Sequence, residues 1–211
     1  MKQKIILVAM LVLLAALGVW CWYWYEHGGQ AAKLARSPDV ADRLRAIRLL
    51  TGKSHSLALT TLDHLADDAE LSVAVQATRA IGKAGSDRAR VLVGAILRRA
   101  RTGRVRGEAA AVLGQFEGTD AKLLAVTLAE DLDAHVRAGA ARGLARLHAR
   151  AGLAALVGAL RDKDPMVREV AIVAIQKVIG ARFLFSPRAS EWVRERQVDA
   201  IVKALEKHKM L

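Results

Sequence analysis

A nine-residue pattern of apolar, charged and small positions recurs along most of the chain. In its clearest copy Val136 is followed by Arg137, a small residue lies four places after Val136, and an aliphatic residue lies eight places after it. Neighbouring copies are 31 or 32 residues apart, and the other four begin at Asp42, Val73, Val105 and Val167. An internal repeat of this length is typical of an α-helical solenoid, in which stacked helix pairs share one core.

Apolar residues at intervals of three and four predict a first helix upstream of each copy, and the copy itself predicts the second helix. The first helices carry a leucine seven or eight residues before the copy: Leu34, Leu65, Leu97, Leu128 and Leu160. Residues three before the copy are expected to cap the second helices, since Asp and Thr side chains accept hydrogen bonds from free N–H groups there: Asp39, Glu70, Thr102, Asp133 and Asp164. Glycines are expected to end four second helices: Gly52, Gly85, Gly118 and Gly180.

The fifth position of every copy is alanine, which predicts how the repeats stack. The residues are Ala46, Ala77, Ala109, Ala140 and Ala171. Because a one-carbon side chain lets two helices approach closely, we expect these alanines to be buried between second helices of adjacent repeats.

Two stretches, Asp131-Leu-Asp-Ala-His-Val-Arg137 and Asp162-Lys-Asp-Pro-Met-Val-Arg168, consist of an acidic turn followed by Val-Arg. They resemble HEAT repeats, especially the short bacterial HEAT-like repeats that also occur in phycobilin lyases. The resemblance covers about residues 31–180 and implies an all-α solenoid of about five helix pairs. For function it implies a binding scaffold. The second copy departs from the pattern, because Ala74 stands where arginine is expected.

After Gly180 the period breaks, since the next leucine in phase is Leu205, which lies 45 residues after Leu160. Residues 181–211 are therefore predicted to form an insertion with three aromatic residues and a capping helix that ends near Lys209. The aromatic residues are Phe183, Phe185 and Trp192. They are expected to fold the insertion onto the last repeat, or alternatively to anchor a partner, because aromatic side chains concentrate binding energy at interfaces.

The chain begins with an apolar segment, Ile5–Tyr25, which contains no charged residue and is long enough as a helix to cross a bilayer. Aromatic residues at its end predict a membrane interface: Trp20, Trp22, Tyr23, Trp24 and Tyr25. We interpret residues 1–25 as one retained transmembrane anchor and residues 26–30 as a short linker. The alternative is a signal peptide cleaved after Gly18.

The location of the solenoid depends on the orientation of this anchor. Lys2 and Lys4 favour a cytoplasmic tail, whereas lysine and arginine residues soon after the segment favour the opposite orientation. Because the segment resembles an uncleaved signal, we expect a single-pass protein of a bacterial inner membrane with its solenoid on the periplasmic side.

The formal charge of +12 indicates anionic partners rather than a particular fold. Arg43, Arg106, Arg137 and Arg168 occupy one repeat position, where we expect ion pairs with acids of the neighbouring repeats (Asp131, Asp133, Asp162, Asp164) rather than a row that binds anions. The third copy differs, because seven arginines follow Asp87 up to Arg106 and the acidic turn is lost. Arg98, Arg99, Arg101 and Arg104 are therefore candidate contacts to anionic lipid headgroups or an acidic protein surface, unless they are only a solvated face; nucleic acid is less favoured.

The sequence contains none of the catalytic patterns sought: no paired His, Cys, Asp or Glu spacing for a metal, no glycine-rich phosphate loop and no nucleophile elbow. We expect no enzyme activity, no cofactor and no small-molecule substrate. The favoured hypothesis is a scaffold or accessory subunit of a larger membrane complex that mediates protein–protein interaction. The alternatives are a cofactor-handling, lyase-like HEAT protein and nucleic-acid binding through the basic third repeat.

Overall fold

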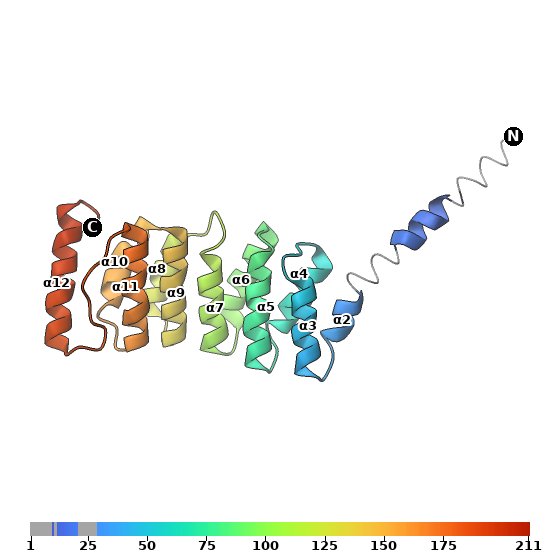
Figure 1. Ribbon diagram of the computed structural model, residues 1–211, viewed down its shortest axis with the longest axis horizontal. Helices are drawn as coiled ribbons and strands as arrows, with labels where there is room; N and C mark the ends of the chain where they lie inside the picture. The colour runs from blue at the N-terminus through green and yellow to red at the C-terminus, as the bar shows by residue number, and fades with distance from the viewer. Residues whose placement is uncertain (1–9, 11, 21–28) are drawn as a thin grey trace.

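The computed structural model describes residues 10, 12–20 and 29–211. From α2 to α12 the helices form one elongated row, with α2 at one end and α12 at the other (Figure 1). The second helices of the repeats are α3 (Val40–Leu50), α5 (Leu71–Lys83), α7 (Gly103–Leu113), α9 (Ala134–Leu147) and α11 (Pro165–Ile179). The first helices are α2 (Gln30–Leu34), α4 (Ser56–Leu65), α6 (Asp87–Arg99), α8 (Ala121–Glu130) and α10 (Leu153–Ala159), and a 3₁₀ turn, Arg150–Gly152, precedes α10.

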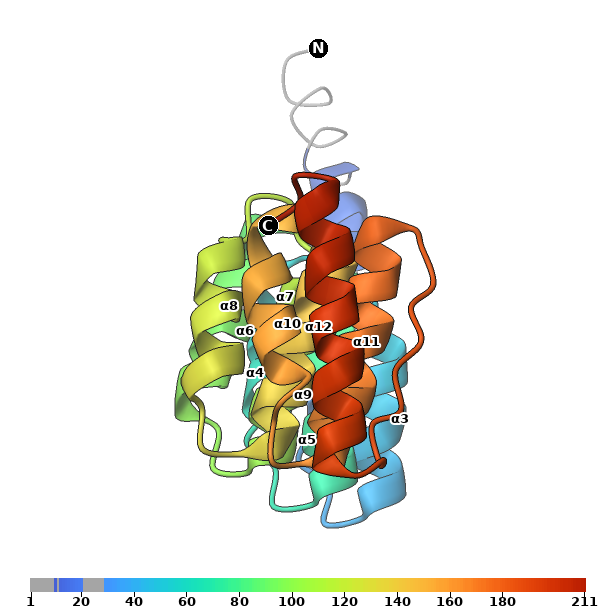
Figure 2. The same cartoon turned by 90° about the vertical axis from the view of Figure 1, so that its left-hand side faces the viewer.

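The helices lie in two layers. Seen along the row, α4, α6 and α8 lie on one side and α3 and α11 on the other (Figure 2). The core lies between the layers, and the leucines predicted for the later first helices, Leu65, Leu97, Leu128 and Leu160, are buried in it. An all-α repeat solenoid is thus confirmed.

The predicted residues cap all five second helices, because in each case the side chain accepts a hydrogen bond from a backbone N–H of the first turn. Glu70 and Thr102 accept the longest of these hydrogen bonds, each 3.4 Å, from the nitrogens of Ser72 and Val105. Pro165 follows Asp164 at the first helical position, where the missing N–H costs nothing.

One predicted helix end was wrong. Helix α7 ends at Leu113, and its C-cap is Gly114 rather than Gly118. Gly118 lies in the following loop with a φ of +73°, a backbone conformation that favours glycine. Helix α2 is also only five residues long, so the first pair is much less complete than the others within the part of the chain that is described.

The five repeat alanines are fully buried, as expected. The approach of α7 to α9 is closer still and depends on glycine. A Cβ atom at Gly139 would overlap the backbone of Gly107, and a Cβ at Gly107 would overlap the carbonyl of His135. No side chain fits between these two helices at that point.

Helix α12 (Glu191–Lys207) covers the last repeat. It buries Val198, Ile201 and Leu205, whereas the other predicted apolar positions, Val193 and Val202, are half-buried. Arg161 contacts this helix through Glu195 (Nε–Oε2, 2.8 Å) and Asp199 (Nη2–Oδ1, 3.4 Å). The predicted capping helix is therefore present, and it ends two residues earlier than expected.

In residues 10, 12–20 and 29–211, no helix combines the length and apolar character that a membrane crossing requires. Most of the predicted anchor, including residues 5–9 and 21–25, lies outside these ranges.

Candidate interaction surface

Four arginines of the second helices, Arg43, Arg106, Arg137 and Arg168, form a row that we call the arginine ladder. Arg137 shows its geometry most completely. Nη1 donates hydrogen bonds to the carbonyl oxygens of Asp131 (2.9 Å) and Leu132 (3.0 Å), in the turn just before its own helix. Nε and Nη2 donate to the two carboxylate oxygens of Asp162 in the next repeat, at 2.7 and 2.8 Å. One guanidinium thus fixes a turn and joins two repeats.

Arg43 follows the same plan, whereas Arg106 makes, among the described residues, only one of its two kinds of contact, the one to the next repeat. Arg43 donates from Nη1 to the carbonyls of Ser37 and Pro38, both at 2.9 Å, and its Nε lies 2.8 Å from Asp68. Arg106 reaches Asp131 at 3.5 Å. Asp131 and Asp162 therefore pair with the ladder as expected, whereas Asp133 and Asp164 accept helix-capping hydrogen bonds instead.

The ladder ends on the aromatic insertion. Arg168 donates from Nη1 to the carbonyls of Asp162 (2.6 Å) and Lys163 (3.0 Å), and from Nε to the carbonyl of Pro187 (2.7 Å). Burial lowers the pKa of the Arg168 guanidinium, and the nearby charge of Arg194 lowers it further. A backbone carbonyl in the insertion thus replaces the carboxylate that a further repeat would supply.

The ladder is interrupted between the second and third repeats. The ladder position in α5 is Ala74, and the turn position that holds Asp68, Asp131 and Asp162 in other repeats is Ala100. Both alanines line an open cavity of about 530 Å³, together with Asp67, Asp68, Arg99 and Arg101. The arginine and its acidic acceptor have therefore been lost from the same interface.

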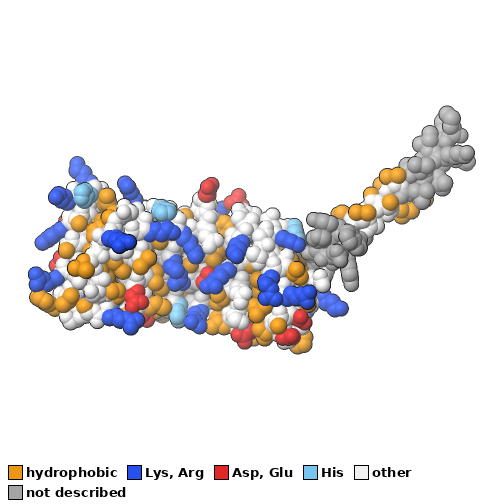
Figure 3. Space-filling model, viewed as in Figure 1, with side chains coloured by type: hydrophobic (Ala, Val, Ile, Leu, Met, Phe, Trp, Pro, Cys, Tyr) orange, Lys and Arg blue, Asp and Glu red, His pale blue; other side chains and the backbone are white. Residues whose placement is uncertain are grey.

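The basic third repeat lies beside this gap. Arg98, Arg101 and Arg104 are exposed, and in residues 29–211 no hydrogen bond or ion pair engages their guanidinium groups. Basic side chains are spread along the visible face of the solenoid, while the acidic ones occupy a few small groups (Figure 3). The three guanidinium groups are available to an anionic partner.

Arg99 differs from its three neighbours. Its Nη2 lies 2.7 Å from Asp63 and 3.1 Å from Asp67, so that it links α6 to the preceding first helix, α4. The sequence interpretation missed this role, because Asp63 and Asp67 were not considered as its partners. The two acids precede Arg99 by 36 and 32 residues, which is close to one repeat, and this spacing could have identified them as its partners.

The aromatic residues of the insertion fall into two groups. Phe183 and Phe185 are half-buried and pack against the core. The loop that carries them is held by hydrogen bonds from Gln176 Nε2 to the carbonyl of Phe183 (3.1 Å) and from the nitrogen of Ser186 to Gln197 Oε1 (2.8 Å). Trp192 is 66% exposed, and Arg196 lies over its ring, 4.9 Å from the centroid.

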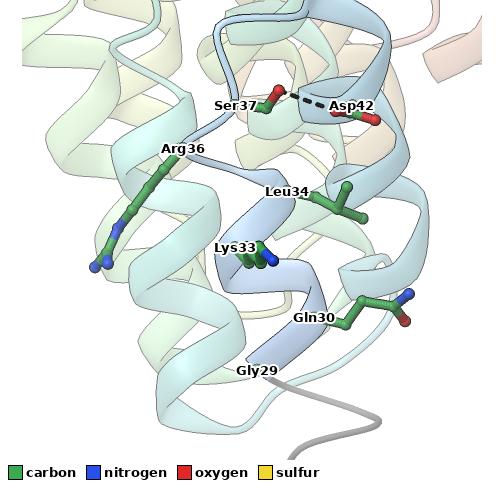
Figure 4. Close-up of a pocket in the computed structure, with 7 residues that line it drawn as sticks. All are labelled: Gly29, Gln30, Lys33, Leu34, Arg36, Ser37 and Asp42. Carbon is green, nitrogen blue, oxygen red and sulfur yellow. Dashed lines mark hydrogen bonds between the residues drawn. The ribbon is translucent and has the colours of Figure 1, made fainter.

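A second open cavity, of about 700 Å³, lies at the α2 end of the solenoid (Figure 4). It is lined by Gly29, Gln30, Lys33, Leu34, Arg36, Ser37 and Asp42. Inside this group Ser37 Oγ donates a hydrogen bond to Asp42 Oδ2 at 2.9 Å.

Of the predicted membrane-interface residues, only Trp20 is described, and it is 63% exposed. Trp22, Tyr23, Trp24 and Tyr25 lie outside the described residues. In the part of the chain that the structure describes, no group of three or more His, Cys, Asp or Glu residues is placed to hold a metal ion.

Residues 121–208 match the family model for HEAT repeats. Among solved structures, human deoxyhypusine hydroxylase in complex with glycerol is similar, with a TM-score of 0.50 and 21% identity over 74% of this chain. The chain spans 63% of the length of that hydroxylase, and at this identity the likeness shows the fold alone. A designed armadillo repeat protein is also similar, with a TM-score of 0.42 and 19% identity over 72% of this chain and 82% of the designed one. None of the curated proteins matches the chain.

The family match covers α8 to α12, the same region in which the ladder and the turn acids are complete. We conclude that the chain is an all-α repeat solenoid, and that its residues 121–208 are similar to HEAT repeats.

Proposed function

We propose that this protein is a non-enzymatic scaffold, an accessory subunit that docks on a larger membrane complex through its basic third repeat. The observation that carries the proposal is that three exposed arginines without an acceptor in residues 29–211 lie within residues 98–104 of that repeat. In the other repeats the ladder arginines are held by carbonyls and carboxylates of the chain itself. Arg98, Arg101 and Arg104 have no such acceptors among the described residues, so their hydrogen-bonding capacity is left for a partner.

Membrane attachment is the second part of the proposal. It is supported by the uncharged segment Ile5–Tyr25 and by the aromatic residues that end it. The linker, residues 26–30, reaches on the order of 10–15 Å, so the solenoid would stay near the headgroups. On the periplasmic side of a bacterial inner membrane, it would face the extracytoplasmic parts of its neighbours.

The partner surface is expected to be acidic. Each arginine near an anionic membrane contributes about 1 kcal/mol, and the attraction decays within a Debye length of roughly 8–10 Å. Three free arginines therefore supply a useful but salt-sensitive attraction. Anionic headgroups are expected to add to it wherever the third repeat lies close to the bilayer.

Extraction of the tagged full chain in mild detergent, followed by identification of what co-purifies, tests the scaffold proposal. A membrane complex in stoichiometric amount supports it. A bound pigment or tetrapyrrole would instead favour the lyase-like alternative, and recovery of the chain alone would contradict the role of complex subunit.

The role of the third repeat is tested with a triple variant, Arg98→Gln, Arg101→Gln and Arg104→Gln. Arg99 stays unchanged, because it joins α6 to α4. The control removes three exposed arginines elsewhere, Arg48→Gln, Arg150→Gln and Arg182→Gln, so that the net charge changes equally. The first variant should lose the complex at moderate salt and the control should retain it; equal losses would mean that only net charge matters.

A further inference from the structure

The interruption of the ladder occurs on both sides of one interface. Residues at the position of Ala74 in other second helices are Arg43, Arg106, Arg137 and Arg168, and those at the position of Ala100 are Ser37, Asp68, Asp131 and Asp162. Loss of the arginine alone would leave a buried acid without its partner, which is costly. With both lost, the interface keeps a cavity of about 530 Å³ instead of an unpaired charge.

Alanine at position 100 also removes an acceptor from the backbone. In the other four repeats the residue at this position accepts a hydrogen bond from the N–H two places on: Asp39 to Ser37, Glu70 to Asp68, Asp133 to Asp131, and Asp164 to Asp162. The corresponding N–H belongs to Thr102, and the Ala100 side chain offers it no oxygen. The missing group is therefore an oxygen acceptor, and in three of the four sister repeats it is a carboxylate.

Some of the charged side chains that line the cavity already form ion pairs within the chain, and one does not. Asp68 is paired with Arg43, and Asp67 is paired with Arg99. Of the charged residues that line the cavity, only Arg101 forms no ion pair or side-chain hydrogen bond within residues 29–211. The exposed Arg98 and Arg104 do not line the cavity, so Arg101 is the cationic group within it that is left for an anion.

The rest of the lining is apolar. Leu71 and Val105 line the cavity together with four alanines: Ala66, Ala69, Ala74 and Ala100. Such a surface suits the methylene carbons of a side chain that carries its charge at the tip.

We propose that this cavity binds the carboxylate of an acidic side chain, Glu or Asp, presented by the partner protein. The carboxylate occupies the place that Asp131 and Asp162 fill in their repeats, where it accepts hydrogen bonds from the guanidinium of Arg101 and the N–H of Thr102. This inference rests on the proposed function and adds the anchor point of the partner: the exposed arginines attract an acidic surface, and the gap in the ladder receives one of its side chains.

The test uses the full chain in detergent and a fluorescent peptide of alternating Glu and Ser, with a Gln–Ser peptide as the uncharged reference. Ala100→Asp supplies the missing carboxylate from within the chain and should weaken binding about tenfold or more, because a hydrogen-bonded charge contact is lost to the peptide. Arg101→Gln should weaken it to a similar degree. Three of the four sister repeats carry Asp at this position, but Ala74 offers no ladder arginine to pair with it, so Ala100→Asp should have a lower Tm, and binding is compared at a temperature at which both proteins are folded.

Two controls separate the cavity from general charge effects. Ala129→Asp adds the same charge at an exposed position of the next repeat, and Arg88→Gln removes an exposed arginine from the start of α6. Both should change the Kd less than about twofold. The cavity is ruled out if Ala100→Asp binds like wild type, or no more weakly than Ala129→Asp.

The outcomes also distinguish this inference from the proposed function. If Arg98→Gln and Arg104→Gln weaken binding while Ala100→Asp does not, the third repeat is the docking surface and the cavity is not its anchor. If no arginine variant affects binding, the docking surface itself is wrong.

Discussion

Arg137 and Asp162, which are 25 residues apart, form a two-point ion pair with nitrogen–oxygen distances of 2.7 and 2.8 Å. Their side chains are only 6% and 10% exposed. Removal of one partner from a buried pair leaves the other charge without compensation and typically costs about 3–5 kcal/mol. We therefore expect Arg137→Ala to lower the free energy of unfolding by about that amount in chemical denaturation. Arg79→Ala is the matched control, because Arg79 pairs with Glu108 near the surface, where loss of a pair costs about 0–1 kcal/mol.

The same pair predicts a dependence of stability on pH. Burial alone would raise the pKa of the Asp162 carboxyl, but hydrogen bonds from Arg137 and from the N–H of Asp164 outweigh it, and the pKa lies below its usual value of 3.8. A carboxyl with a depressed pKa in the folded state adds stability above its unfolded pKa, and this stability is lost as the pH falls through the folded pKa. Acid unfolding below about pH 4 should therefore be shallower in Asp162→Asn. Equal acid profiles for the variant and wild type would contradict the linkage.

Close contact between the second helices of adjacent repeats predicts the positions at which a larger side chain lowers the stability. Gly139→Ala should lower stability by about 1–3 kcal/mol, because its Cβ would overlap the Gly107 backbone, which cannot move aside as a side chain can. Ala140→Leu should cost a similar amount at a fully buried position. Gly158→Ala is the control, since nothing lies near its Cβ position in α10, and replacement of a helical glycine should stabilise by about 0.5–1 kcal/mol. Thermal melting of the three variants measures these effects, and an unchanged Tm for Gly139→Ala would contradict the close approach.

The aromatic residues of the insertion should differ in role: some should stabilise the fold, and one should be available for binding. Phe183→Ala and Phe185→Ala should lower the Tm, because both rings pack against the core. Trp192→Ala should change it little, since the ring is mostly exposed and an exposed cation–π contact is worth about 0.5–1 kcal/mol. If Trp192 anchors a partner, its alanine variant should weaken complex recovery without a change in Tm. A large fall in Tm for Trp192→Ala would mean that the ring is structural.

Retention of the N-terminal segment is tested by the intact mass of the protein extracted from membranes. If residues 1–25 are kept, the mass should correspond to the full chain of 211 residues, with or without the initiator Met. A mature form that begins at Val19 would show that the segment is a cleaved signal.

Much of the fold was predictable because the same local pattern occurs five times at a nearly constant spacing. One nine-residue copy does not identify a solenoid, but five copies place an alanine, a ladder residue and a helix cap at fixed positions. Helix capping is decided within one turn of helix, so Asp133 and Asp164 were assigned correctly. The end of α7 was not, since Gly114 and Gly118 both suit a helix end locally; the helix ends at Gly114, where α9 leaves no room for a Cβ atom.

The candidate surface was predictable only in part. The basic third repeat is visible in composition, but its four candidate arginines look equivalent in the sequence. Arg99 differs because α4 lies beside α6 and brings Asp63 within 2.7 Å of it. The cavity was not predicted, although the sequence shows that Ala74 replaces an arginine and that the third repeat has lost its acidic turn, because only the stacking of the second and third repeats brings Ala74 and Ala100 to one cavity.

The sequence by itself determined the helical repeats, their period, their caps and the excess of positive charge, because each depends on residues within one or two turns of helix or on composition. The tertiary structure decided which charges neutralise one another. Arg137 meets Asp162 and Arg168 meets the carbonyl of Pro187 because stacking sets those distances. It also decided that α7 and α9 meet backbone to backbone at Gly107 and Gly139. The physical reason is that ion pairs and close helix contacts depend on positions a full repeat apart, which only the packed repeats bring together.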